Sequence, residues 1–395
     1  MGMNNTDIIV IGAGIHGAGV AQAAAAAGHE VLVLEQRALA FGTSSRSSKL
    51  IHGGLRYLES RQFALVRECL RERALLLRLA PELVRLQPFH IPVYRDTRRR
   101  PWQLRAGLAL YALLGGLAPG TRFRTLPRRQ WEALDGLDTG GLQQVFQYHD
   151  AQTDDAALTR AVMRSAQALG ARLELPAVFT GAELAPGEVI VHYRCAEREH
   201  SCRARVLVNA AGPWANQVLA RITPPPPTLA VDLVQGSHIL LDGRLERGFY
   251  YLEAPRDRRA VFAMPWHDRI LVGTTEVPYE GDPAAVAPTP EEMDYLLGTF
   301  AHYFPAWRGA GRERIRDAFA GLRVLPTAAG SAFDRPRETI LHTDRARRPR
   351  LLTVYGGKLT AYRATAEKVM KRLAASLPAR RPRGDTRKLP LTPAT

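Results

Sequence analysis

The residues most able to do chemistry are gathered in residues 42–59, GTSSRSSKLIHGGLRYLE. Five hydroxyl side chains precede His52, two glycines, Arg56 and Tyr57. Glycines and hydroxyls let the backbone approach phosphate oxygens, and an imidazole can accept a proton near neutral pH. A guanidinium suits an anion because its N–H groups bind in pairs. The segment therefore predicts a site for a phosphorylated ligand beside a base, although a polar loop opening a helix at 62–79 would have the same composition.

A nucleotide-binding unit precedes this segment. Residues 7–36 read as strand, glycine-rich turn, helix and strand, with GxGxxG formed by Gly12, Gly14 and Gly17. Gly12 allows the tight turn, Gly14 lets the backbone approach a diphosphate, and Gly17 lets the helix pack on the strand. Glu35 follows about 20 residues later, where a carboxylate accepts hydrogen bonds from ribose hydroxyls. The pattern predicts a bound dinucleotide but does not separate FAD from NAD.

Residues 42–59 resemble the signature of FAD-dependent glycerol-3-phosphate dehydrogenases, in the D-amino-acid-oxidase-like flavoprotein superfamily. Residues 206–214, 263–276 and 353–362 resemble further segments of that family, and the resemblance covers almost the whole chain. It favours FAD because a second diphosphate-facing segment, here 43–48, is typical of these flavoproteins. It implies an α/β fold in which a Rossmann-like FAD-binding domain carries an inserted mixed β-sheet substrate-binding domain.

We expect the FAD-binding domain to be discontinuous. It is predicted at residues 1–90, 150–215 and 340–378, and the substrate-binding domain at 91–149 and 216–339. The basic, proline-rich tail at 379–395 is predicted to be poorly ordered. Family members are expected to continue for roughly another hundred residues into a helical C-terminal domain, about the size of a small domain.

The resemblance also implies which residues contact FAD. The expected contacts are Gly12, Gly14, Gly17, Glu35, Gln36, Thr43, Ser44, Ser45, Ser48, Leu50, His52, Gly53, Gly54, Val178, Ala211, Gly212, Gly357, Lys358, Leu359 and Thr360. The backbone near Val178 is expected to meet the adenine. The Gly356-Gly357 turn opens a helix, where free N–H groups suit the pyrimidine edge of a reduced flavin.

The activity that the resemblance implies is oxidation of sn-glycerol 3-phosphate to dihydroxyacetone phosphate. Hydride would pass to flavin N5 and electrons to a quinone. Such a reaction needs a base for the hydroxyl proton and positive charge near the developing alkoxide. His52 is our candidate base, and Arg56 is the alternative catalytic group, as a stabiliser of the alkoxide.

A phosphate clamp is expected from Arg323, Arg337, Lys358 and Tyr57. In a chain this basic, a solvated charge is the ordinary interpretation of any lysine or arginine. The motifs around Arg323 and Lys358 favour a catalytic or binding role for these two. Only the resemblance supports Arg337.

Two other functions fit the same residues. A related FAD-dependent oxidase would use oxygen to oxidise a 2-hydroxy acid or an amine, and its basic clamp would hold a carboxylate. A flavin-binding module without turnover would bind FAD that no substrate reduces.

The chain of 395 residues has a formal charge of +16, which favours an acidic partner. Its basic residues lack the interleaved aromatics of a nucleic-acid surface, so nucleic acid ranks last among the acidic partners and we expect none. Residues 106–120 are uncharged but shorter than the ~20 residues of a membrane-spanning helix. With flanking arginines and Trp102, they suit a segment lying on anionic lipid, although an ordinary buried helix is the alternative.

Location follows from weaker signals. The three cysteines form no disulfide framework, and the N-terminus enters a strand without room for a signal peptide. We expect a cytoplasmic protein that can lie peripherally on the inner face of the cell membrane. Among other residues, Asp154 and Asp155 are expected to cap a helix, Thr289 to cap another at 289–304, and His238 to be either a strand residue or catalytic.

Overall fold

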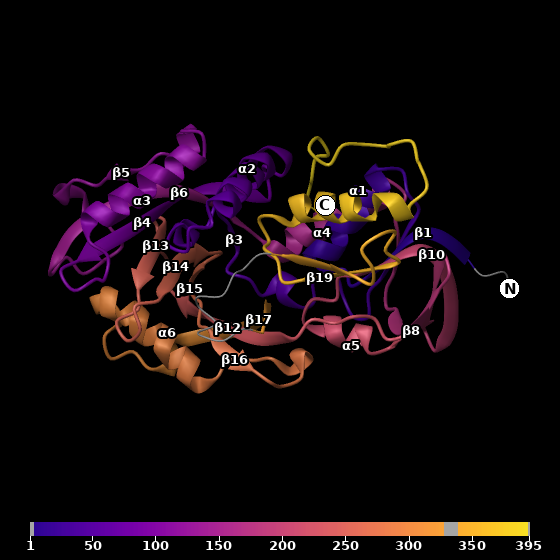
Figure 1. The fold of residues 1–395 in the computed structure, drawn as a ribbon. Coiled ribbons are helices and arrows are strands. Elements are labelled where there is room, and N and C mark those ends of the chain that lie inside the picture. The colour runs from indigo at the N-terminus through magenta and orange to yellow at the C-terminus, as the bar shows by residue number, and fades with distance from the viewer. Residues whose placement is uncertain (1–3, 328–338, 394–395) are drawn as a thin grey trace.

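The computed structural model describes residues 4–327 and 339–393. Within these residues the strands form a nine-stranded and a ten-stranded sheet, which lie side by side (Figure 1). The helices are α1 (Ile15–Ala26), α2 (Phe63–Leu79), α3 (Pro101–Leu114), α4 (Asp155–Ala168), α5 (Ala215–Leu219), α6 (Pro290–Tyr303) and α7 (Tyr362–Leu373). The α/β fold class is confirmed.

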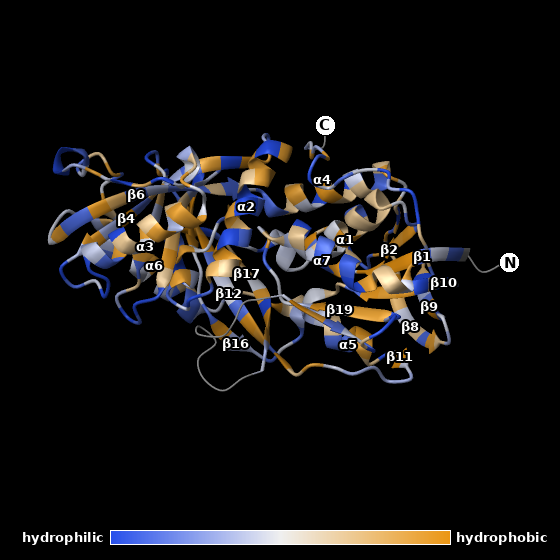
Figure 2. Ribbon diagram, turned by 45° about the horizontal axis from the view of Figure 1, so that its top comes forward, coloured by the Kyte–Doolittle hydropathy of each residue, from blue (hydrophilic) through white to orange (hydrophobic). Residues whose placement is uncertain are grey.

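The nine-stranded sheet is built on the expected βαβ unit. Its strands are β1 (Asn4–Ile11), β2 (Val31–Leu34), β7 (Arg172–Glu174), β8 (Val178–Ala185), β9 (Glu188–Cys195), β10 (Arg198–Asn209), β11 (Ile222–Thr223), β18 (Ile340–Thr343) and β19 (Leu351–Tyr355). β1 pairs in parallel with β2 and β10, and β10 with β19. These central strands are apolar on both faces, as a covered parallel sheet requires (Figure 2).

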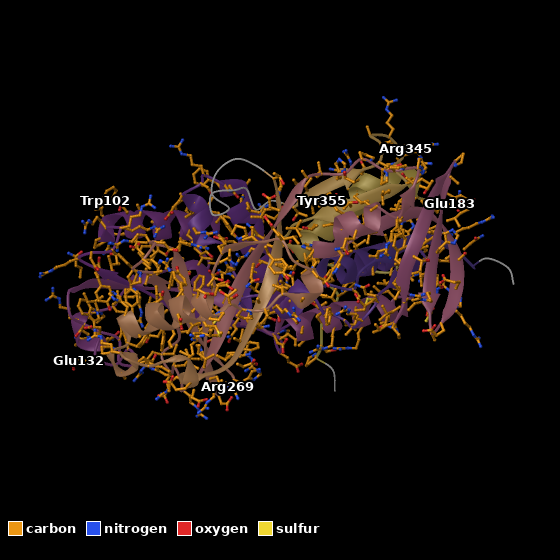
Figure 3. The ribbon with its side chains drawn as sticks, turned by 90° about the horizontal axis from the view of Figure 1, so that it is seen from below. Trp102, Glu132, Glu183, Arg269, Arg345 and Tyr355 are labelled. Atoms are coloured by element: carbon orange, nitrogen blue, oxygen red, sulfur yellow. The ribbon has the colours of Figure 1, made fainter. Side chains whose placement is uncertain are left out.

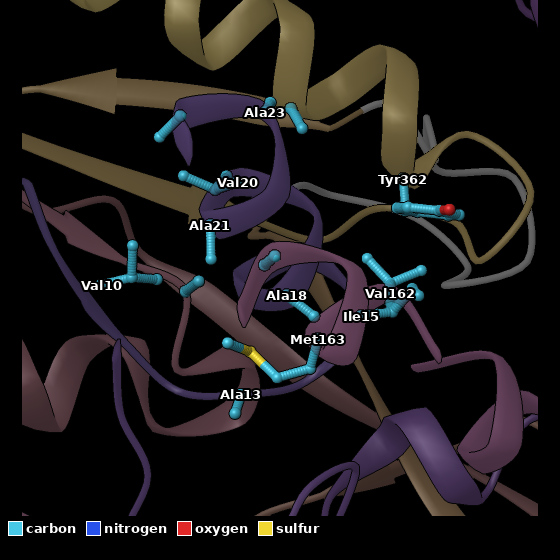
Figure 4. Packing of buried hydrophobic residues seen from close by; sticks show 14 of the residues in the cluster. Val10, Ala13, Ile15, Ala18, Val20, Ala21, Ala23, Val162, Met163 and Tyr362 are labelled. Atoms are coloured by element: carbon cyan, nitrogen blue, oxygen red, sulfur yellow. The ribbon is translucent and has the colours of Figure 1, made fainter. Parts of the chain in front are cut away.

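Helices α1, α4 and α7 pack together on one face of this sheet (Figure 4). Val10 of β1 faces this layer, whereas its neighbour Ile9 faces the opposite core. Gly17 allows the close approach, because a Cβ there would lie 1.8 Å from the carbonyl oxygen of Gly12. The glycine pattern therefore places the start of α1 directly over the end of β1.

The ten-stranded sheet consists of β3 (Leu50–Ile51), β4 (Val84–Tyr94), β5 (Arg124–Thr125), β6 (Leu142–Thr153), β12 (Val231–Asp242), β13 (Phe249–Glu253), β14 (Ala260–Trp266), β15 (Arg269–Gly273), β16 (Val277–Tyr279) and β17 (Ile315–Pro326). Helix α6 covers one face, and α2 and α3 cover the other (Figure 1). β4 and β6 belong wholly to this sheet, so they run across the domain boundaries that we placed at 90 and 150. The division into domains stays a prediction.

The local signals for three helices agree with the structure. α2 lies within the helix expected at 62–79. The Asp154 side chain accepts a hydrogen bond from the Ala157 amide at the start of α4. Thr289 and Glu292 form a capping box at the start of α6. In α4 and α6 the side-chain caps satisfy free amides at the first turn, whereas α2 begins without a side-chain cap.

The prediction of a poorly ordered tail is wrong for residues 379–393. Arg380 pairs with Asp7 at 2.9 Å, and the Arg383 amide donates to the Ala26 carbonyl at 2.7 Å. Leu391 is buried against the core that contains α1 and α4. The composition suggested disorder because arginines and prolines dominate it. However, the burial of Leu391 and two ion pairs, of Arg380 with Asp7 in β1 and of Arg387 with Glu367 in α7, hold the segment in place.

Candidate functional site

A cavity of about 440 Å³ lies between the two sheets. Its walls include Ile11 and Leu34 from the nine-stranded sheet and Tyr251 and Phe262 from the ten-stranded sheet. The predicted site residues on its surface are Gly12, Gly14, Glu35, Gln36, Thr43, Ser44, Ser48, Leu50, His52, Gly54, Arg56, Tyr57, Ala211, Gly212, Arg323, Gly357, Lys358, Leu359 and Thr360. Segments far apart in the sequence therefore meet at one surface of ligand-binding size.

Four predicted contacts do not line the cavity. Gly17 packs beneath it, and the Ser45 hydroxyl donates only to nearby carbonyls of its own turn. Gly53 is buried behind the cavity wall, and Val178 lies between two residues, Ala177 and Phe179, that do line it. Arg337 lies outside the described residues.

One end of the cavity is shaped by glycines and a serine. Gly12 has φ +92°, and a Cβ there would meet the Ala210 carbonyl oxygen at 2.8 Å. The Ser44 hydroxyl accepts a hydrogen bond from the Ile15 amide at 2.9 Å, and a Cβ on Gly14 would lie 3.0 Å from that hydroxyl. The start of α1 thus faces a narrow space lined by glycines and the Ser44 hydroxyl, which suits an anion.

Glu35 lies at the end of β2, next to the glycine turn. Its Oε2 accepts from the Ala13 amide at 2.9 Å and its Oε1 from the Arg37 amide at 2.9 Å. These two bonds fix the carboxylate, and each oxygen retains a lone pair. The geometry suits the ribose contact that the sequence predicts.

His52 also lines the cavity, where its backbone is held in place. Its backbone amide donates to the Thr360 hydroxyl at 3.0 Å, which joins this segment to the residues before α7. Burial lowers the pKa of the imidazole to about 4, the nearby Lys358 adds to that effect, and Asp150 opposes it. The ring is neutral at neutral pH, so it can accept a proton.

Cationic side chains gather beside His52. Arg56, Arg259, Arg323 and Lys358 all line the cavity. The Lys358 ammonium lies 3.4 Å from the centroid of the Tyr57 ring. Burial lowers the pKa of Arg323 to about 10, and Arg56 and Arg259 add to this shift. A group of like charges in one cavity is costly, which favours an anionic ligand there.

Sequence reasoning missed two charged residues in this part of the cavity, the cation Arg259 and the carboxylate Glu276. Glu276 accepts from Arg259 at 2.6 Å and from Arg323 at 3.2 Å. Glu276 falls within residues 263–276, whose resemblance to a family segment did not single out this carboxylate. Its isolated charge, just after an apolar strand, was the available signal.

A buried ion pair supports the loop at 43–49. Lys49 Nζ lies 2.7 Å from Asp155 Oδ1, and Asp155 Oδ2 accepts from the Ser47 amide and hydroxyl. Asp155 was expected only to cap a helix. It also holds the hydroxyl-rich loop against α4. Ser47 and Asp155 are 108 residues apart, so nothing in the sequence indicated this contact.

His238 has a partner within the protein. Its Nε2 lies 2.9 Å from the Ser48 hydroxyl, and its ring stacks on Phe319 at 4.9 Å. Burial lowers its pKa to about 3, so the ring is neutral. His238 also lines the cavity, so both interpretations that the sequence leaves open, a strand histidine and a catalytic one, stay predictions.

Residues 7–363 match the family described as FAD dependent oxidoreductase. The chain belongs to this family. It is 39% identical to a glycerol-3-phosphate dehydrogenase of Pseudomonas aeruginosa over 93% of this chain and 71% of the relative. It is 38% identical to a D-erythritol 1-phosphate dehydrogenase of Brucella abortus over 94% of this chain and 74% of the relative.

Solved structures of flavoenzymes share the fold. A Bacillus halodurans glycerol-3-phosphate dehydrogenase complexed with FAD superposes with a TM-score of 0.74 at 27% identity, over 98% of this chain and 68% of that one. An L-alpha-glycerophosphate oxidase of Mycoplasma pneumoniae with FAD bound has a TM-score of 0.79 over the full length of both chains, and at 17% identity it supports the fold alone. The resemblance noted in the sequence is confirmed.

The cavity of this FAD-dependent oxidoreductase fits its cofactor. Gly12 and Gly14 leave the start of α1 open to a diphosphate, and Glu35 is fixed beside it. Gly357, at φ +116°, touches His16, and a Cβ there would lie 2.0 Å from the His16 Nε2 atom. Gly12, Gly14, Glu35 and Gly357 are among the residues expected to hold FAD. Their individual contacts with the cofactor stay predictions.

Proposed function

We propose that this flavoenzyme oxidises sn-glycerol 3-phosphate to dihydroxyacetone phosphate. The observation that carries the proposal is the cluster of Arg56, Arg259, Arg323 and Lys358 on one cavity surface with the neutral His52. Such a cluster suits a dianionic phosphate, because guanidinium groups bind its oxygens in pairs. The similarity to glycerol-3-phosphate dehydrogenases supports the same choice.

FAD, when bound, supplies the hydride acceptor. The chain's own residues bind and orient the substrate and accept its proton. The phosphate is held by Arg323, Lys358 and Tyr57, together with Arg337, which lies outside the described residues. His52 accepts the proton of the substrate hydroxyl. Arg56 lies near the Tyr57 ring at 6.0 Å and stabilises the alkoxide as it forms. Holding both ends of a small substrate in line is worth several powers of ten in rate.

A longer polyol phosphate is the second candidate substrate. The relative named D-erythritol 1-phosphate dehydrogenase is as similar to this chain as the glycerol-3-phosphate dehydrogenases are. Both substrates carry a phosphate and a secondary alcohol, so the cationic cluster does not separate them. A 2-hydroxy acid or an amine fits less well, because a single carboxylate or an ammonium would leave several cations uncompensated.

Electrons are proposed to pass to a membrane quinone, from a protein lying on the anionic inner face of the cell membrane. In the part of the chain that the structure describes, no helix is long and apolar enough to cross a bilayer. However, Trp102 on α3 is 70% exposed (Figure 3), and Leu113 on the same helix is 62% exposed. We call the exposed apolar residues from α2, β4, α3 and its following turn the α3 patch, which consists of Phe63, Leu86, Trp102, Leu113 and Leu117.

Charge complementarity supports this docking. The exposed arginines that flank α3 in the sequence include Arg95, Arg98, Arg100, Arg105, Arg122, Arg124, Arg128 and Arg129. An apolar surface bordered by cations suits an anionic lipid interface. The patch therefore favours peripheral attachment over the alternative of an ordinary buried helix.

One comparison of substrates tests the proposed function. The FAD-loaded protein is mixed with glycerol 3-phosphate, erythritol phosphate, lactate or an amino acid, and initial rates are followed with a quinone analogue or with oxygen. We expect turnover with phosphate esters and the quinone analogue. Turnover with lactate or the amino acid and oxygen would instead identify an oxidase, and no turnover with any substrate would favour a binding module.

A further inference from the structure

A buried hydrogen-bond network lies behind the turn that follows His52. The Gly53 amide donates to the Tyr111 hydroxyl at 2.9 Å and lies 3.3 Å from Asp150 Oδ1. The same hydroxyl lies 2.9 and 2.8 Å from the two Asp150 carboxylate oxygens. Arg73 pairs with Asp150 at the same Oδ1 atom. Side chains from α3 and β6 thus meet one backbone amide, and a side chain from α2 pairs with the carboxylate of β6.

The direction of each hydrogen bond in this network is fixed. The Gly53 amide can only donate, and an ionised carboxylate can only accept. The Tyr111 hydroxyl must therefore accept from Gly53 and donate to Asp150. Burial raises the pKa of Tyr111 well above its ordinary value, with Asp150 adding to the shift, so the hydroxyl keeps its proton. Burial alone would lower the pKa of Arg73, but Asp150 raises it, so the guanidinium keeps its positive charge beside the carboxylate.

Such a network is expensive to bury. Arg73 is 2% exposed, Asp150 is 1% exposed and Tyr111 is fully buried. Replacing a buried ion pair by apolar residues is often neutral or stabilising, so stability alone does not explain these side chains. What distinguishes them is their position beside the site, because Asp150 itself lines the cavity.

The turn also fits closely onto the tyrosine. A Cβ on Gly53 would lie 2.4 Å from the Tyr111 hydroxyl oxygen. The next residue, Gly54, has φ +77° and lines the cavity. On the other side, the His52 amide donates to Thr360. The turn is therefore held from behind by Tyr111 and from the C-terminal segment by Thr360.

We propose that Tyr111 is a positioning residue that sets the His52–Gly54 turn against the flavin, with Asp150 and Arg73 orienting its hydroxyl. The expected effect on bound FAD depends only on the family's use of that cofactor. The expected effect on substrate oxidation rests on the proposed function. A shift of the turn changes the surroundings of the flavin ring and moves His52 from the substrate, and small misplacements cost large factors in rate.

The variant Tyr111→Phe tests this proposal. It keeps the buried ring but removes the hydroxyl, leaving the Gly53 amide with only the 3.3 Å contact to Asp150. We expect hydrogen–deuterium exchange in the peptide containing residues 50–58 to be roughly tenfold faster, the equivalent of one hydrogen bond. We also expect an altered visible absorption and circular dichroism spectrum of bound FAD. With glycerol 3-phosphate, flavin reduction at saturation should slow by about tenfold while substrate affinity changes little.

The matched control is Tyr303→Phe. The Tyr303 hydroxyl donates to the Glu253 carbonyl at 2.6 Å, in the core beneath α6. This variant also loses a buried tyrosine hydrogen bond, so it reports the general loss of stability. If Tyr111→Phe matches Tyr303→Phe in peptide exchange and in its FAD spectrum, the proposal is overturned. Both readouts need no substrate, so they remain decisive even if glycerol 3-phosphate is not oxidised.

Discussion

Glu276 accepts a hydrogen bond from Arg323 at 3.2 Å on the surface of the cavity. Its second oxygen accepts from Arg259 at 2.6 Å, so one buried carboxylate fixes two guanidinium groups. Glu276 reduces the net positive charge of the cavity. It also aligns Arg259 and Arg323 before the substrate binds. Pre-aligned groups bind with less loss of side-chain entropy.

Glu276→Gln should therefore weaken the binding of glycerol 3-phosphate by roughly tenfold, because the amide holds the two arginines less firmly. The substrate dissociation constant, from the dependence of flavin reduction on substrate concentration, measures this. Asp242→Asn is the matched control, since Asp242 pairs with Arg316 at an exposed position of the same sheet. Tighter binding in Glu276→Gln would show that charge repulsion, and not alignment, is the main effect of this carboxylate.

The interaction of Ser44 with α1 gives a prediction about the cofactor. Ser44→Ala removes the hydroxyl that accepts from Ile15 and faces Gly14, so the affinity for FAD should fall by about tenfold. Reconstitution of apoprotein with FAD, followed by fluorescence, measures the dissociation constant. Ser45→Ala is the control, because the Ser45 hydroxyl contacts only its own turn. Equal losses of affinity in both variants would contradict this assignment.

His52→Ala should slow flavin reduction by substrate by about 10²-fold or more, because the hydroxyl proton loses its acceptor. Stopped-flow measurement of the yellow absorbance records this rate. His302, which is exposed on α6, provides the control variant His302→Ala. A wild-type reduction rate in His52→Ala would remove His52 from the role of base, leaving Arg56 as the catalytic group of this segment.

The pH dependence of the same rate follows from the lowered pKa of His52. Because burial lowers that pKa to about 4, the neutral, proton-accepting form predominates at every pH well above this value. Flavin reduction should be nearly constant through the neutral range and fall only as the pH approaches the lowered pKa. A decline centred near the ordinary histidine pKa of about 6.5 would contradict the buried, neutral imidazole.

Folding stability should also decrease as the pH falls. Burial lowers the pKa of His16, His52 and His90 to about 4 and that of His238 to about 3. The unfolded chain binds more protons between these values and about 6.5, so stability is fully present above that range and decreases as the pH falls through it. Thermal unfolding at a series of pH values measures this loss.

Membrane docking predicts co-sedimentation with anionic liposomes at low salt. The double variant Trp102→Ser, Leu113→Ser should lose most of this binding, because both side chains are exposed on α3. Leu175→Ser is the matched control, since Leu175 is also exposed but lies outside the α3 patch. Equal recovery in the supernatant with and without liposomes would exclude the docking surface.

Local patterns were sufficient for the nucleotide-binding unit and for much of the cavity surface. The caps of α4 and α6 act through neighbours in sequence, and the glycines before α1 and the acid after β2 follow the spacing of a dinucleotide-binding unit, so spacing alone predicts them. The resemblance then placed Arg323 and Lys358 at the same cavity. Both line it, 35 residues apart in sequence.

The missed features depend on tertiary contacts. Tyr111 meets Gly53 across 58 residues, and Asp155 meets Ser47 across 108 residues. No periodicity or motif connects such pairs. The tail was misjudged for the same reason, because the burial of Leu391 depends on a surface formed by distant helices.

The most direct test of the central claim is an anaerobic titration of the purified, FAD-loaded protein with sn-glycerol 3-phosphate. We expect the yellow flavin absorbance to disappear in proportion to added substrate and dihydroxyacetone phosphate to form in equal amount. If dithionite bleaches the flavin but neither glycerol 3-phosphate nor erythritol phosphate does, the cationic cavity does not oxidise a polyol phosphate.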